Sequence, residues 1–142
     1  GLYQQKLFVD DFLSIVRANH PLVQNKLNMK KYLELSHALA FTQGKGPGLV
    51  DKILAKQGLK RKVVLQSHHF LTLSYIVSSS DLIATIPSRA ARFLASSQDI
   101  ICLKPPIKIP SFTISQFWHE SSHNDQANQW LRNSVYQLCS RI

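Results

Sequence analysis

Residues 60–87 read Lys-Arg-Lys-Val-Val-Leu-Gln-Ser-His-His-Phe-Leu-Thr-Leu-Ser-Tyr-Ile-Val-Ser-Ser-Ser-Asp-Leu-Ile-Ala-Thr-Ile-Pro, and this stretch decides the fold. The run at 60–66 predicts a strand, the apolar spacing at 67–78 predicts a helix, and residues 81–87 predict a second strand. Two strands that flank a helix through connections of a few residues form a parallel pair with a right-handed crossover. The stretch therefore predicts an α/β fold.

The same alternation continues upstream. A short helix at 28–35, which Asn28 can cap, leads to a buried strand at 37–42. A glycine-rich loop then opens a helix with Pro47 at its first position, and Gly58 ends that helix as a left-handed cap. We expect parallel strands near residues 38–42, 62–66 and 82–86.

Downstream, Ser88 is predicted to cap a helix, and residues 100–103 are predicted to form a strand. Residues 112–118 alternate as a strand, and a final amphipathic helix begins near Asn124. At the other end of the chain, residues 5–18 are rich in strand formers without a helical period, which predicts extended chain.

The composition limits the class of protein. A chain of 142 residues with 44% hydrophobic and 18% charged residues excludes disordered and low-complexity classes. Its formal net charge of +9 favours an anionic ligand or a polyanion as partner. No apolar segment is long enough for a membrane span, so we expect no membrane partner, no export and a cytoplasmic location. The two cysteines, Cys102 and Cys139, are expected to be reduced and buried.

In an open α/β sheet, ligands bind beyond the carboxyl ends of the parallel strands, where helix starts present backbone N–H groups. The predicted strands end at residues 42–46, 67–69 and 87–88. We therefore expect a ligand at this edge. His68 and His69 are neighbours, so on a helix they would point to different sides, which disfavours a joint metal site.

The segment His119-Glu120-Ser-Ser-His123 matches the zinc-peptidase pattern H-E-x-x-H. That chemistry needs both histidines on one face of a helix and normally a third protein ligand. Here the preceding residues alternate as a strand, and Asp125 is the only acidic residue that follows. We favour a strand-to-helix turn, with no metal, cofactor or catalytic residue, and keep a zinc-dependent hydrolase as the alternative.

Two further motifs have alternative interpretations. Gly44, Gly46 and Gly48 lack the spacing of a phosphate-binding loop, so a flexible turn is favoured over an anion site. The basic group formed by Lys52, Lys56, Lys60, Arg61 and Lys62 contains no aromatic residue that could stack on bases, so a solvated face is favoured over a nucleic-acid surface.

Several segments follow one another in a characteristic order over nearly the whole chain. They are Leu7-Phe-Val-Asp-Asp-Phe12, Val16-Arg17, His20-Pro21, Gly48-Leu-Val-Asp-Lys-Ile-Leu54, Gly58-Leu-Lys-Arg-Lys-Val63, His69-Phe-Leu71, Asp81-Leu-Ile-Ala-Thr-Ile-Pro87, Trp118-His119 and Trp130-Leu-Arg132. Together they resemble the effector-binding (substrate-binding) domain of LysR-type transcriptional regulators. The resemblance makes Trp118-His119, a polar turn and Trp130-Leu-Arg132 the ordinary end of that domain.

The resemblance implies one complete α/β lobe of the periplasmic-binding-protein-like (type II) fold with an incomplete second lobe. Residues 21–110 would form lobe two, the effector-binding subdomain. Residues 1–20 and 111–142 would form crossover strands and a remnant of lobe one. We expect a fragment, because the family's N-terminal winged helix-turn-helix, linker helix and the first part of lobe one have no counterpart before Gly1.

The resemblance also implies a function without enzymatic activity. In the family, lobe two contacts the effector through the loop after its first strand and the start of the helix after its next strand. The corresponding residues here are Thr42, Gln43, Ser67, His68, His69 and Phe70. The expected partners are a small-molecule effector, for which the charge favours an anion, and further copies of the chain in a homodimer or higher homo-oligomer. DNA would be bound only through a domain outside this chain.

Overall fold

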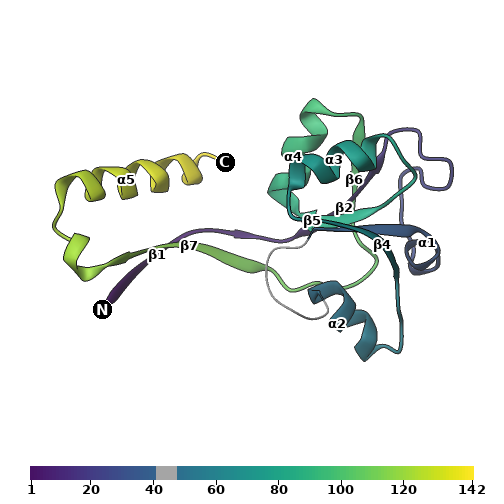
Figure 1. The fold of residues 1–142 in the computed structure, drawn as a ribbon, viewed down its shortest axis with the longest axis horizontal. Coiled ribbons are helices and arrows are strands. Elements are labelled where there is room, and N and C mark those ends of the chain that lie inside the picture. Colours follow the sequence, from purple (N-terminus) through teal and green to yellow (C-terminus); the bar gives the residue numbers. More distant parts are fainter. Residues whose placement is uncertain (41–47) are drawn as a thin grey trace. The chain divides into compact units, whose positions relative to one another are not determined.

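The computed structural model describes residues 1–40 and 48–142, and it divides the chain into two compact units (Figure 1). Unit one consists of Gly1–Asp10 and Ser111–Ile142, and unit two of Asp11–Pro110. The elements of unit two are β2 (Phe12–Arg17), α1 (Met29–Glu34), β3 (Ser36–Ala40), α2 (Leu49–Lys56), β4 (Lys62–Ser67), α3 (Phe70–Ser78), β5 (Ala84–Pro87), α4 (Ser88–Ser97) and β6 (Ile100–Leu103). The assignment of 1–20 and 111–142 to one lobe, and of 21–110 to the other, stays a prediction.

The strands of unit two lie side by side in the order β4, β3, β5, β2, β6. β3 and β4 are parallel, and β2 is antiparallel to both β5 and β6. β3 joins the residue that precedes β5 through a parallel bridge between His37 and Ile83, where Ala38 N–H donates to the Ile83 carbonyl at 2.8 Å. The predicted α/β alternation is therefore confirmed, and so is the parallel direction of β3, β4 and β5.

Both faces of this sheet are covered, which explains why its inner strands lack a clean apolar alternation. In β2, Val16 belongs to the core on the face of α1 and α2, whereas its neighbour Ile15 belongs to the core under α3 and α4. Ile83 and Ala84 divide between the two cores in the same way. Because successive strand residues point to opposite faces, most positions of such a strand are apolar.

Two of the predicted helix ends are confirmed. The Asn28 side chain accepts a hydrogen bond from Lys31 N–H at 2.8 Å, which caps α1. Gly58 follows α2 with φ +69°, the left-handed conformation that glycine adopts without a steric cost. α2 begins at Leu49, and the prediction for Pro47 falls outside the described residues.

Two predicted helix starts are wrong. α3 begins at Phe70 rather than at Ser67, because Ser67 is the last residue of β4 and pairs with Ala40 of β3. Ser88 is the first residue of α4 rather than its cap, and its hydroxyl donates a hydrogen bond to the Asp11 carboxylate. The first prediction places the start of α3 inside the preceding strand. The second places the cap of α4 one residue too late.

Unit one contains β1 (Leu2–Asp10), β7 (Phe112–His119), a 3₁₀ turn (Glu120–Ser122) and α5 (Gln126–Ser140). β1 and β7 pair antiparallel along their length (Figure 1). Asp125 caps α5 through a 2.7 Å bond from Asn128 N–H, so the helix begins two residues after the predicted position at Asn124. No helix in the described part of the chain is long and apolar enough to cross a membrane.

Candidate functional site

The carboxyl ends of β3, β4 and β5 meet at one edge of the sheet in unit two, because β3 runs parallel to both neighbours. Ala40 is the last residue of β3, Ser67 the last of β4, and Pro87 the last of β5. The structure thus places Ser67, with His68, His69 and Phe70 after it, at the edge that the sequence predicts. Thr42 and Gln43 lie outside the described residues.

Ser67 closes the turn between β4 and α3. Its hydroxyl accepts a hydrogen bond from His69 N–H, with an N···O distance of 3.2 Å, and donates one to the His69 carbonyl, with an O···O distance of 3.2 Å. A serine hydroxyl has one proton and two acceptor positions, so this turn leaves one acceptor position open. To donate to a ligand, the hydroxyl must rotate away from the carbonyl, and the long bond that it gives up is a weak one.

The two histidines lie in this turn rather than on the helix. His69 is the N-cap residue of α3, with φ −121° and ψ 121°, and its side chain makes no capping hydrogen bond. The side chains of His68 and His69 are both exposed. The expectation that they point to opposite sides of a helix is therefore wrong, because the chain is extended before Phe70. Phe70 is half-buried and packs against the core under α3 and α4.

The starts of α3 and α4 differ in what faces their backbone N–H groups. At α4, Ser88 N–H donates to the Asp11 carbonyl at 2.8 Å, and the Ser88 hydroxyl donates to the Asp11 carboxylate. A carboxylate of the chain thus already occupies the start of that helix. At α3, no side chain in the described part of the chain caps the helix at His69. The first N–H groups of α3 are therefore the ones open to an anionic ligand.

A buried polar chain behind this edge was missed from the sequence. The Tyr32 hydroxyl lies 2.8 Å from the Thr85 hydroxyl, which lies 2.9 Å from the Ser14 hydroxyl. All three residues are buried. The available signal is a single polar residue inside each of two apolar strands, because a buried hydroxyl needs a partner on a neighbouring element.

His37 and Arg61 are two further buried polar residues of unit two. His37 Nε2 donates to the Tyr32 carbonyl at 2.6 Å, and burial lowers the pKa of His37 to about 4. Arg61 is 4% exposed and pairs with the Asp51 carboxylate, so it does not belong to a basic surface. The predicted basic group at 52–62 is therefore reduced to its four lysines.

The structure separates the two histidines of the H-E-x-x-H pattern. His119 ends β7, and its Nδ1 is 2.9 Å from the Ser121 hydroxyl. His123 Nδ1 accepts a hydrogen bond from Trp118 Nε1 at 3.2 Å, while its ring stacks on Tyr3 with the centroids 4.0 Å apart. The metalloprotease geometry needs one continuous helix, whereas this segment is a strand end and a 3₁₀ turn. No cluster of three potential metal ligands occurs among the described residues, and the zinc hydrolase alternative is not supported.

Sequence comparison identifies relatives along nearly the whole chain. The family described as the LysR substrate binding domain matches residues 1–140. The HTH-type transcriptional activator NagR of a Ralstonia species is 33% identical over 140 residues, which cover 99% of this chain and 46% of NagR. NahR of Pseudomonas putida, also an HTH-type transcriptional activator, is 30% identical over 97% of this chain and 46% of NahR. The chain spans about half the length of the curated relatives it matches.

Structural comparison agrees with the sequence. The regulatory domain of MexT, a transcriptional activator in Pseudomonas aeruginosa, aligns over 96% of this chain and 67% of that domain, with a TM-score of 0.82 and 30% identity. The fold is thus that of the LysR effector-binding domains, which have the periplasmic-binding-protein-like type II fold. With a family match over residues 1–140, the predicted resemblance is confirmed, and the chain belongs to the LysR substrate-binding domain family, the effector-binding regulatory part of LysR-type transcriptional regulators.

Proposed function

We propose that this chain senses a small anionic metabolite and thereby controls DNA-dependent transcription, through a DNA-binding domain that lies outside it. One observation supports the position of the site: the first N–H groups of α3 have no capping side chain in the described part of the chain. They lie directly after the Ser67 turn, at the carboxyl edge of the parallel strands. NagR and NahR are both transcriptional activators, which supports a role in regulation and a non-enzymatic one.

The proposed effector contacts combine polar and apolar groups. His68 and His69 contribute exposed imidazoles, and α3 contributes backbone N–H groups. The half-buried ring of Phe70 contributes an apolar contact. An imidazole has an N–H donor in either protonation state, so these groups suit a carboxylate. The Ser67 hydroxyl contributes once it rotates, and Thr42 with Gln43 would complete the contacts from the loop after β3.

The proposed mechanism is a shift between lobe arrangements. An effector that contacts one arrangement better than another changes their populations by the difference in its affinity for the two. We infer that residues 21–110 form the effector-binding lobe and that 1–20 with 111–142 belong to the crossovers and the other lobe. The many exposed apolar side chains of α5, which buries none of its residues within the described chain, support this division.

Self-association into homodimers or larger homo-oligomers belongs to the same proposal. Homo-oligomerisation is typical of the family, and α3 and α4 both expose large apolar side chains: Leu71, Tyr75 and Phe93. Large apolar side chains that are exposed to solvent can mark a protein interface when they gather on one surface. A cytoplasmic location follows from the proposed role, because the target of regulation is DNA.

The test is a thermal-shift screen of small carboxylates against the purified protein, followed by calorimetric titration of each hit. An effector should raise the melting temperature, because it binds the folded state preferentially. Ser67→Ala and His69→Ala should weaken binding by about tenfold, the effect of losing one to two hydrogen bonds to a charged ligand.

Ser79→Ala is the matched control, because Ser79 lies at the other end of α3, and in the described part of the chain its hydroxyl bonds only to carbonyls of that helix. Equal affinity in the wild type, Ser67→Ala and His69→Ala would show that the site assignment is wrong. In the full-length regulator, the same hits should change reporter transcription. Hits that bind without any such change would contradict the regulatory role.

A further inference from the structure

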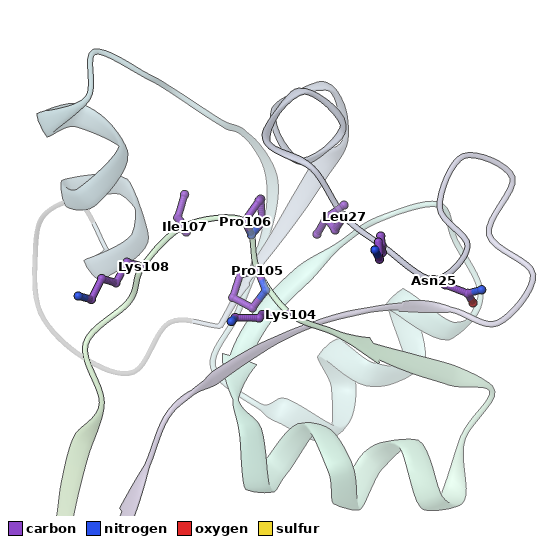
Figure 2. A pocket seen from close by; sticks show the side chains of 8 residues that line it. Asn25, Leu27, Lys104, Pro105, Pro106, Ile107 and Lys108 are labelled. Carbon is purple, nitrogen blue, oxygen red and sulfur yellow. The ribbon is translucent and has the colours of Figure 1, made fainter.

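A pocket of about 720 Å³ lies in unit two between residues 25–27 and 104–108 (Figure 2). The first segment precedes α1, and the second follows β6. None of Ser67, His68, His69 and Phe70 lines this pocket. Its volume is within the range of sites that hold metabolite-sized molecules. The pocket therefore has room for a ligand, and it is separate from the proposed effector contacts.

The floor of the pocket is apolar and anchored to the core. Leu27 and Ile107 line the pocket and also belong to the buried core on the face of α1 and α2. Pro105 is buried beside them, and it is followed by a second proline, Pro106 (Figure 2). Two consecutive prolines fix two φ angles, so this wall has little freedom to collapse. A preformed wall lowers the entropic cost of binding a ligand.

Three of the residues that line the pocket are lysines. Lys26, Lys104 and Lys108 line it and are exposed, and no acidic residue is among its lining residues in the described chain. Within the same described part of the chain, none of the three lysines takes part in an ion pair. Unpaired positive charges along one pocket raise the local concentration of anions.

We propose that this lysine pocket, formed by residues 25–27 and 104–108, binds an organic anion that has two or three negative charges and an apolar body. The lysines would bind the carboxylate or phosphate groups at the opening, while the hydrocarbon or aromatic part covers Leu27, Pro105 and Ile107. An inorganic anion would contact only the lysines, and a neutral molecule would contact only the apolar floor of the pocket. The proposal goes beyond the proposed function, since it concerns a different surface of unit two.

The test uses phthalate, a rigid aromatic dianion, as the probe and calorimetric titration of the purified protein as the measurement. Phthalate should bind saturably, inorganic phosphate should bind more weakly, and phthalamide, which has the same ring without charge, should not bind measurably. Lys104→Gln combined with Lys108→Gln should weaken phthalate binding by about five- to tenfold, because two of three exposed charges are lost.

Lys52→Gln combined with Lys56→Gln is the matched control, because it removes the same charge from exposed lysines of α2 that do not line the pocket. This variant should bind phthalate like the wild type. A second readout is independent of the lysines: the aromatic ring of phthalate should shift the methyl NMR signals of Leu27 and Ile107. Equal weakening in the two double variants, unsaturable binding, or unshifted methyl signals would each overturn the proposal. Ser67→Ala should leave phthalate binding unchanged, which separates this site from the effector contacts.

Discussion

Arg61 binds the carboxylate of Asp51 through two parallel hydrogen bonds, Nε to Oδ1 at 2.8 Å and a terminal nitrogen to Oδ2 at 2.9 Å. The guanidinium group is almost fully buried, with 1% of the side chain exposed, whereas 25% of the Asp51 side chain is exposed. This pair connects the strand region around β4 to α2. The Arg61 guanidinium holds the pKa of the Asp51 carboxyl below its usual value.

Removal of the Asp51 carboxylate should destabilise the protein strongly. In Asp51→Ala, the buried guanidinium loses its partner, which costs about 3 kcal/mol of the free energy of unfolding. Asp81→Ala is the control, because Asp81 also binds an arginine Nε at 2.8 Å but with 62% of its side chain exposed. An exposed pair contributes less than about 1 kcal/mol. Denaturant unfolding measures both variants, and similar losses would contradict the role assigned to burial.

Acid should destabilise the protein partly through His37. Burial lowers the pKa of His37 to about 4, from 6.5 in the unfolded chain, so the unfolded state binds more protons between these two values. The contribution of His37 to the free energy of unfolding is therefore greatest above pH 6.5 and falls as the pH drops toward 4, by at most about 1.4 kcal/mol per pH unit. Asp51 acts in the same direction at lower pH, because its lowered pKa makes protonation favour the unfolded chain.

His37→Leu isolates the contribution of the histidine. The variant should show a shallower loss of stability between pH 6.5 and pH 4 than the wild type, measured by denaturant unfolding at fixed pH values. The same slope in His37→Leu and the wild type would show that His37 does not titrate in this way.

Tyr32→Phe should destabilise the protein by about 1 kcal/mol, the usual effect of losing one buried hydrogen bond. Tyr32 is fully buried, and its hydroxyl binds Thr85. The Ser14 hydroxyl still satisfies Thr85 in the variant, which keeps the cost small. Tyr75→Phe, at a position 65% exposed, should change the midpoint of thermal unfolding by much less. Equal shifts in the two variants would contradict a structural role for the buried hydroxyl.

The strand and helix pattern of unit two could be predicted because its signals are local. The four-residue strand at 100–103, the Asn28 cap and the left-handed Gly58 each depend on a few neighbouring residues. The errors involve partners far apart in the sequence. The local sequence predicts that Ser88 caps a helix. In the fold, its hydroxyl instead binds Asp11, which is 77 residues away in the sequence. The local sequence likewise predicts that Arg61 belongs to a basic surface, whereas in the fold it pairs with Asp51.

The candidate site could be predicted only as a location. Parallel strands fix the edge at which Ser67 and His69 lie, so topology alone selects them. The hydrogen bonds of the Ser67 hydroxyl, however, depend on the backbone of a turn that the sequence had assigned to a helix. The pocket at residues 104–108 could not be predicted from the sequence. The prolines there predict only irregular chain, and the other wall of the pocket comes from residues 25–27.

The exposed face of α3 should control self-association. Leu71 and Tyr75 are four residues apart, so they lie on one face of the helix, and they are 61% and 65% exposed. Leu71→Lys should shift the apparent mass measured by light scattering toward that of a 16.1 kDa monomer, because it places a charge in an apolar contact. Thr72→Lys adds the same charge one residue further along the same helix, at an exposed polar position. That variant should keep the mass of the wild type at equal protein concentration. If both variants dissociated alike, or neither did, the contact between copies would have to lie elsewhere, with the exposed Trp130 and Leu138 of α5 as the next surface to test.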